Sequence, residues 1–135
     1  MTTKPIPDAY RTAMPYFIVN HAASAIEFYK KAFGATERVR LVDPTGKVMH
    51  AEIRIGNSPL MLADEFPDMG YRSPQSLGGS PVSILLYVED VDTLFRQAVA
   101  AGAKENNGGC RPIRWRPPRH TDRSIWARLV IGDQN

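Results

Sequence analysis

His50 and Glu52 are the residues of this sequence whose types and spacing are best suited to chemistry. Side chains alternate along a strand, so the run Val48-Met49-His50-Ala51-Glu52-Ile53-Arg54-Ile55 predicts both on one face, with Arg54 beside them. Residues two positions apart on a strand have Cα atoms about 6.5–7 Å apart, close enough for a hydrogen bond or a shared ligand. A histidine beside a carboxylate can act as a general base or hold a cationic group, so both are candidate catalytic residues.

The same strand also permits a purely structural interpretation. Its other positions are Met49, Ala51, Ile53 and Ile55, and we expect them to pack against a helix. The polar set would then be a solvated sheet face, on which Glu52 pairs with Arg54. A closed cavity over this face would favour the functional interpretation, because charged strand residues usually face water.

No other histidine is expected to complete a metal site with His50. His21 falls at the start of a predicted helix, and His120 lies in an atypical tail. The acidic groups at residues 64–65 and 89–92 lack the spacing of a calcium loop. The sequence therefore predicts no metal and no cofactor.

The elements that would position His50 and Glu52 form one module over residues 13–64. Aromatic and β-branched residues predict a first strand ending at Val19, and an apolar stripe predicts a helix that stops at Gly34. Turn-forming residues at 43–46 and 56–58 separate three further strands, which span residues 36–42, 47–55 and 59–63. The order is therefore β-α-β-β-β, preceded by a loose arm at residues 1–12.

The opening pattern returns after a segment rich in proline and glycine, which we interpret as a linker or flap at residues 65–81. An apolar strand is expected at residues 82–88, followed by a helix that Asp90 caps and that ends near Gly102. Residues 82–105 thus start a second, similar module. The prediction is an α+β fold with paired βαβββ modules, of which the second is incomplete.

Six short segments resemble the vicinal oxygen chelate superfamily, which has the glyoxalase/bleomycin resistance protein fold, in its PhnB-like branch. They are Tyr16–Val19, Ala25–Tyr29, Phe33–Ala35, His50–Gly56, Met61–Glu65 and Tyr87–Asp92. The resemblance covers residues 5–105. It implies paired βαβββ modules whose sheets curl around a cavity, usually in a homodimer.

The resemblance also implies where a metal would be held in enzymes of the superfamily, on four strands facing the cavity. Those positions fall on Met14, Met61 and Ser83, with the fourth in a strand that the tail does not supply. Thioether and hydroxyl groups are poor ligands for the divalent ions that prefer imidazole and carboxylate. The site of the metal-dependent members is therefore expected to be absent, and no catalysis is assigned.

The preferred function is metal-free binding of a small organic ligand. Its predicted cavity is lined by Met14, Tyr16, His50, Glu52, Met61 and Ser83. Apolar bodies with a few polar handles are typical of such pockets. The alternative is a metal-dependent lyase, isomerase or dioxygenase of the same superfamily.

Composition excludes several other classes. The chain has 135 residues, enough for one compact domain, with 43% hydrophobic and 23% charged residues as in ordinary globular proteins. No stretch is long and apolar enough for a membrane span or a signal peptide, so we expect no membrane partner and a cytoplasmic location. A single cysteine, Cys110, excludes an internal disulfide.

The basic charge is confined to the tail. Residues 1–105 hold 11 Lys and Arg against 12 Asp and Glu, whereas residues 106–135 hold 6 Arg against 2 Asp. An arginine-rich tail could bind nucleic acid or an acidic partner, and Trp115 between two arginines could stack on a base. Such patches are common, so nucleic acid is the weaker prediction.

The tail is better explained by a one-base shift of the reading frame near Asn106. A back-translation of residues 110–129, read one base out of register, gives a sequence that resembles the usual ending of the superfamily. Tryptophan has one codon, and its shifted bases can encode only glycine; Trp115 and Trp126 fall where that ending has glycine. Without the missing strands, residues 82–88 would keep an unpaired edge, so we expect a homodimer that covers it.

Overall fold

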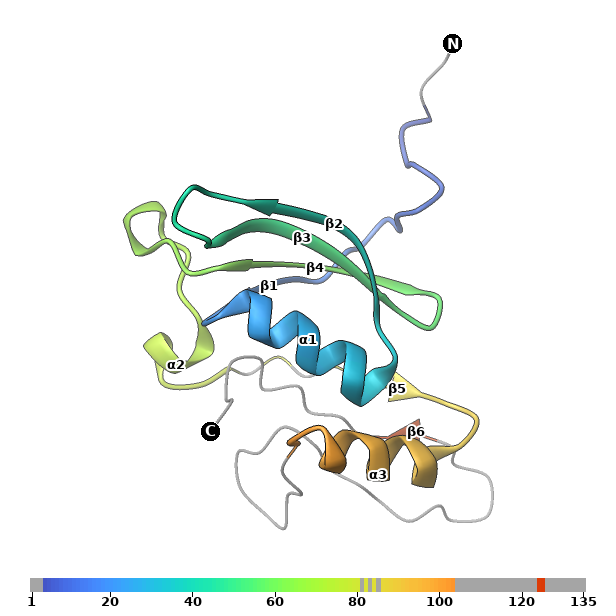
Figure 1. The fold of residues 1–135 in the computed structure, drawn as a ribbon. Helices are drawn as coiled ribbons and strands as arrows, with labels where there is room; N and C mark the ends of the chain where they lie inside the picture. The colour runs from blue at the N-terminus through green and yellow to red at the C-terminus, as the bar shows by residue number, and fades with distance from the viewer. Residues whose placement is uncertain (1–3, 81, 83, 85, 104–123, 126–135) are drawn as a thin grey trace.

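The computed structural model describes residues 4–80, 82, 84, 86–103 and 124–125, and they form an α+β fold (Figure 1). A four-stranded sheet has the order β1-β4-β3-β2, and helix α1 packs on one of its faces. Helix α3 packs against α1 on the side away from that sheet. This mixed class agrees with the sequence prediction.

The sheet combines parallel and antiparallel pairs. Strand β1 (Tyr16–Val19) runs parallel to β4 (Ser58–Asp64), which is antiparallel to β3 (Val48–Ile55). Strand β2 (Thr36–Val42) lies antiparallel on the outer side of β3. The four ranges agree with the predicted strands to within two residues, because turn residues separate them in the sequence.

Helix α1 (Ala22–Phe33) buries the predicted stripe against the sheet. It ends at Gly34, whose φ of 67° lies in the left-handed region that glycine adopts without strain. At the other end, Oδ1 of Asp64 accepts a hydrogen bond from the Ala22 nitrogen at 2.8 Å, and Oδ2 accepts from the Val48 nitrogen at 2.7 Å. This buried carboxylate therefore joins the helix start to two strands.

The segment at residues 65–80 contains two short helical turns, η1 (Pro67–Met69) and α2 (Pro74–Leu77). Glu65 fixes it by accepting hydrogen bonds from the Ser73 nitrogen and the Ser76 hydroxyl. Its carbonyl also accepts a hydrogen bond from Nζ of Lys47 at 3.1 Å. The segment is thus tied to the β2–β3 turn.

The strand that opens the second module is shorter than expected. Among the described residues between 82 and 88, only β5 (Leu86–Tyr87) is regular, whereas Val82 and Ile84 lie outside any strand. A strand needs a hydrogen-bonded neighbour, and β5 has one in β6 (Ser124–Ile125), which pairs with it antiparallel. The predicted strand at 82–88 is therefore wrong in length, and β5 pairs on one side with β6, while its other edge has no partner among the described strands.

Helix α3 (Val91–Ala100) follows as predicted, with Oδ1 of Asp90 accepting from the Thr93 nitrogen at 3.1 Å. The predictions for residues 104–123 and 126–135 fall outside the described residues. No helix in the described ranges is long and apolar enough to cross a membrane. A cytoplasmic location stays a prediction.

Candidate functional site

The sheet face opposite α1 carries the predicted polar residues in one row. The register places Tyr16 of β1 beside Met61 of β4, and Met61 beside Glu52 of β3. His50 lies two residues from Glu52 on the same strand, opposite Leu41 of β2. Four of the six predicted lining residues therefore share this face.

A hydrogen-bond chain connects three of them. The Tyr16 hydroxyl lies 2.9 Å from Nδ1 of His50, and Nε2 of His50 lies 3.3 Å from Oε1 of Glu52. A carboxylate can only accept, so in the neutral imidazole Nε2 carries the proton and Nδ1 accepts from Tyr16. The arrangement joins a hydroxyl, an imidazole and a carboxylate in the order that acid–base chemistry uses.

Glu52 is the buried member of this chain, with 6% of its surface exposed. Burial raises the pKa of its carboxyl, but hydrogen bonds from Tyr10 and His50 outweigh burial and hold the pKa below its ordinary value. Oε1 carries both of those hydrogen bonds, whereas Oε2 is buried without a partner. No ion pair joins Glu52 to Arg54, so the pair expected from a solvated face is not formed.

Tyr16 is the accessible end of this hydrogen-bond chain, since 49% of the residue is exposed. Burial is the main cause that raises its pKa, and the nearby Tyr71 and Glu52 raise it further. The phenol therefore keeps its proton at neutral pH and can donate it to His50. Tyr16 therefore faces an open surface on this side of β1.

The remaining lining predictions have different outcomes. Met14 is half-buried in the turn before β1, where its sulfur accepts a hydrogen bond from the Arg11 nitrogen at 3.4 Å. Ser83 lies outside the described residues. Met49 was expected on the helix-packed face, yet it is 55% exposed. A β-bulge causes this difference, because β2 pairs Leu41 with His50 and Val42 with Val48, which leaves Met49 as the extra residue.

Sequence reasoning missed two residues of the site, Tyr10 and Arg38. The Tyr10 hydroxyl donates to Oε1 of Glu52 at 2.6 Å, and the Arg38 guanidinium lies 5.9 Å from the centre of the Tyr10 ring. Arg38 is itself the extra residue of a second bulge, between Glu37 and Val39. Neither position belongs to a periodic pattern, so the sequence offered no signal for them.

The residues present do not fit a divalent metal centre. Within the described ranges, no three His, Cys, Asp or Glu side chains lie close enough to hold an ion. Both ring nitrogens of His50 already have hydrogen-bond partners, and the neighbour between Tyr16 and Glu52 is the thioether of Met61. Such a donor set does not suit the ions that prefer imidazole and carboxylate oxygen.

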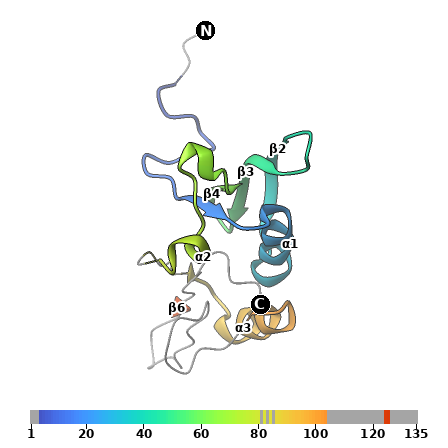
Figure 2. The same cartoon turned by 90° about the vertical axis from the view of Figure 1, so that its left-hand side faces the viewer.

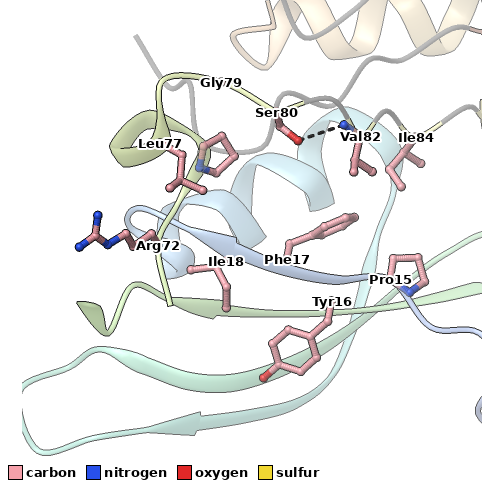
Figure 3. Close-up of a pocket in the computed structure, with 11 residues that line it drawn as sticks. Pro15, Tyr16, Phe17, Ile18, Arg72, Leu77, Gly79, Ser80, Val82 and Ile84 are labelled. Atoms are coloured by element: carbon pink, nitrogen blue, oxygen red, sulfur yellow. Dashed lines mark hydrogen bonds between the residues drawn. The ribbon is translucent and has the colours of Figure 1, made fainter. Parts of the chain in front are cut away.

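A pocket of about 340 Å³ lies at the edge of β1 that faces away from β4 (Figure 3). Phe17 points towards Val82 and Ile84 on its upper wall, while Tyr16 and Ile18 point to the other side of the strand. Its remaining lining comes mainly from the segment after β4 and includes Pro15, Arg72, Pro74, Leu77, Gly79 and Ser80. The sequence had not indicated this pocket, because its walls come from segments without periodicity.

Comparison with known proteins identifies the family. The sequence profile of the Glyoxalase/Bleomycin resistance protein/Dioxygenase superfamily matches residues 11–112. The chain belongs to this superfamily. Solved structures of similar fold include the protein PA1353 from Pseudomonas aeruginosa, with a TM-score of 0.60 and 23% identity over 90% of this chain and 93% of that one. The glyoxalase-type fold predicted from the sequence is thereby confirmed.

Relatives of this superfamily chain include uncharacterized proteins of Mycobacterium tuberculosis and Mycobacterium bovis, each 51% identical over 92 residues. These residues are 66% of this chain and 54% and 60% of the two relatives, so the chain spans little more than half of their length. A gene product from Arabidopsis thaliana has a TM-score of 0.57, with 27% identity over 70% of this chain and 75% of that one.

A further fold relative is the fosfomycin resistance protein FosX from Listeria monocytogenes, whose crystal structure holds Mn(II) and a dihydroxypropylphosphonic acid. It has a TM-score of 0.55 and 18% identity over 86% of this chain and 82% of that one. At that identity the likeness concerns the fold alone. The Mn(II) and the phosphonic acid of that protein therefore indicate nothing about what this chain binds.

Proposed function

We propose that this superfamily chain binds a small organic ligand, without a metal, on the sheet face that carries Tyr16, His50, Glu52 and Met61. The observation that supports it most is the hydrogen-bond chain from the accessible Tyr16 hydroxyl through His50 to the buried Glu52. Such a chain orders three polar groups in advance, so a ligand meets donors and acceptors already in place. Met61 and Leu41 supply apolar surface around them.

The metal-free part of the proposal is tested by metal analysis of the purified protein. We expect less than a tenth of an equivalent of zinc, iron or manganese after expression with each metal supplied. A stoichiometric metal that is lost in His50→Ala would overturn the proposal. That result would favour the alternative function, a metal-dependent lyase, isomerase or dioxygenase.

Ligand binding is tested by screening a library of small organic compounds by ligand-observed NMR. Compounds that bind the wild type are expected to lose at least ten-fold in affinity in His50→Ala and in Tyr16→Phe. Val99→Ala is the control, since Val99 is exposed on α3, which packs against α1 on the side away from the sheet. Hits that bind all four proteins equally would show that this face is not the site.

We also propose that the chain belongs to the PhnB-like branch and that a one-base shift near Asn106 produced its tail. The superfamily profile stops at residue 112, a few residues beyond that position. The six arginines of residues 106–135 then have no role in binding nucleic acid. Salt-sensitive binding of DNA or RNA that depends on residues 106–135 would contradict this proposal.

A further inference from the structure

The N-terminal segment brings a tyrosine into the candidate site. The segment leaves β1 on the side of the sheet away from α1, as both views show (Figures 1 and 2). From there the Tyr10 hydroxyl reaches Oε1 of Glu52 at 2.6 Å, across 42 positions of the sequence. A segment that was expected to be a loose arm therefore contacts the most buried polar group of the site.

Two groups of the sheet hold the phenol of Tyr10. Oε1 of Glu52 accepts a hydrogen bond from its hydroxyl, and the Arg38 guanidinium lies 5.9 Å from the ring centre, within the range of a cation–π contact. A third contact anchors the neighbouring residue, since Nη2 of Arg11 donates to the carbonyl of Asn57 at 3.2 Å. The sheet thus offers an acceptor for a phenolic hydroxyl and a cation for the aromatic ring.

Glu52 retains acceptor capacity beyond these contacts. Its side chain is 8% exposed, and Oε2 is buried without a hydrogen-bond partner. A buried carboxylate oxygen without a donor costs free energy, so this carboxylate depends on the hydrogen bonds that Oε1 accepts from Tyr10 and His50. A ligand that displaces Tyr10 must therefore bring a hydroxyl donor of its own to Oε1.

We propose that Tyr10 occupies the position of the ligand, and that the ligand is a small phenol whose hydroxyl replaces Tyr10 on Glu52 beneath Arg38. This inference rests on the proposed function and names the chemical class of its ligand. It also gives the N-terminal segment a role, because Tyr10 must leave before the phenol enters. The N-terminal segment thus competes with the ligand for Glu52.

Competition within one chain has a measurable consequence. A group tethered by a short flexible segment acts at an effective concentration of about millimolar or higher, so it weakens the apparent affinity of any free ligand for the same atoms. Removing the Tyr10 ring should therefore strengthen binding of a free phenol. A residue that merely packed on the surface would have no such effect.

The experiment titrates p-cresol, which is the tyrosine side chain as a free molecule, into wild type, Tyr10→Ala and Tyr87→Ala, followed by two-dimensional amide NMR. We expect Tyr10→Ala to bind p-cresol at least ten-fold more tightly than the wild type, with shifts at His50 and Glu52. Tyr87→Ala is the matched control, since Tyr87 is 74% exposed on β5, and it should bind as the wild type does.

Two further measurements keep the inference falsifiable. Toluene, which lacks the hydroxyl, should bind Tyr10→Ala at least ten-fold more weakly than p-cresol, and Glu52→Leu in the Tyr10→Ala protein should remove that difference, because it leaves no acceptor for the hydroxyl. Equal binding of p-cresol by wild type and Tyr10→Ala, or equal binding of toluene and p-cresol, would overturn the inference. Library hits that need His50 but leave Tyr10 in place would overturn it while the proposed function stands.

Discussion

The carboxylate of Asp64 and the backbone nitrogen of Ala22 are joined by a 2.8 Å hydrogen bond at the start of α1. The second oxygen of the same carboxylate accepts from Val48 at the start of β3. Ala22 and Val48 are fully or almost fully buried, so no water can replace Asp64 at either nitrogen. The helix and the sheet that carries His50 are therefore positioned by one side chain.

Replacing Asp64 by alanine should destabilise the fold by about 3 kcal/mol, because two buried backbone donors lose a charged acceptor. Asp64→Asn should cost less, since its amide retains one acceptor oxygen. Urea unfolding followed by circular dichroism measures both, with Asp68→Ala as the exposed control. A loss below about 0.5 kcal/mol in Asp64→Ala would contradict this account.

Glu37 should make the free energy of unfolding depend on pH in the acidic range. Hydrogen bonds from Arg40 lower the pKa of its carboxyl most, burial opposes them, and Lys30 lowers the pKa further, to about 2. Because the folded pKa lies below the unfolded one, this stability is complete above the unfolded value of 4.5 and is lost as pH falls towards 2.

The test compares wild type and Glu37→Gln by urea unfolding at several pH values. At pH 7 we expect Glu37→Gln to be about 1–2 kcal/mol less stable, an amount reduced by partial exposure of the ion pairs. The difference should shrink as the pH falls below 4.5. Glu89→Gln, at an exposed position, is the control, and a difference that stayed constant down to pH 3 would speak against the Glu37 network.

The neutral imidazole of His50 should carry its proton on Nε2, since that atom faces the Glu52 carboxylate. Nitrogen chemical shifts of the ring measure this directly. In Glu52→Gln the preference for Nε2 should weaken, because the amide can present either a donor or an acceptor. His21 serves as the internal reference, and a proton on Nδ1 of His50 in the wild type would exclude the proposed order of donors.

Sequencing of the encoding DNA around Asn106 should reveal a one-base insertion or deletion relative to the mycobacterial relatives. Restoring the frame should replace Trp115 and Trp126 by glycine. The restored protein should also melt at a higher temperature, since it regains strands for its second module. Coding DNA that aligns in frame with the relatives through residues 106–135 would refute the shift.

We expect light scattering to give the mass of a homodimer. Within the described residues β1 pairs on one side alone, and Leu77 and Val82 beside its free edge are 64% and 61% exposed. An exposed strand edge flanked by apolar side chains favours pairing with a second chain. Leu77→Glu should therefore shift the mass towards that of a monomer, whereas a wild-type monomer at high concentration would refute the proposal.

Local patterns in the sequence were sufficient for the elements of the first module. Helix α1 and strands β2 to β4 follow from an apolar stripe and from turn residues, because both signals arise from neighbouring positions. The bulge that exposes Met49 depends on how two strands pair, and alternation alone cannot locate it. Strict alternation is the correct expectation for most strands, and it fails at Met49 because of the bulge.

Local spacing alone predicted the site only where its residues share a strand, and the family resemblance added Tyr16 and Met61 on the neighbouring strands. His50 and Glu52 are two positions apart, so alternation placed them together, as the 3.3 Å contact shows. Tyr10 reaches Glu52 from 42 positions away and Arg38 enters through a bulge, so neither contact follows from local spacing. Such contacts depend on the path of the chain over the sheet.

The parallel pairing of β1 with β4 also determines the order in which the molecule can form. During synthesis β1 emerges first, but its only neighbour among the described strands lies more than 40 residues later. The β2–β3 hairpin is local and can form as soon as it leaves the ribosome, whereas β1 has to wait until β4 joins that hairpin. We therefore expect the row of Tyr16, Met61 and Glu52 to close only after β4 has been synthesised.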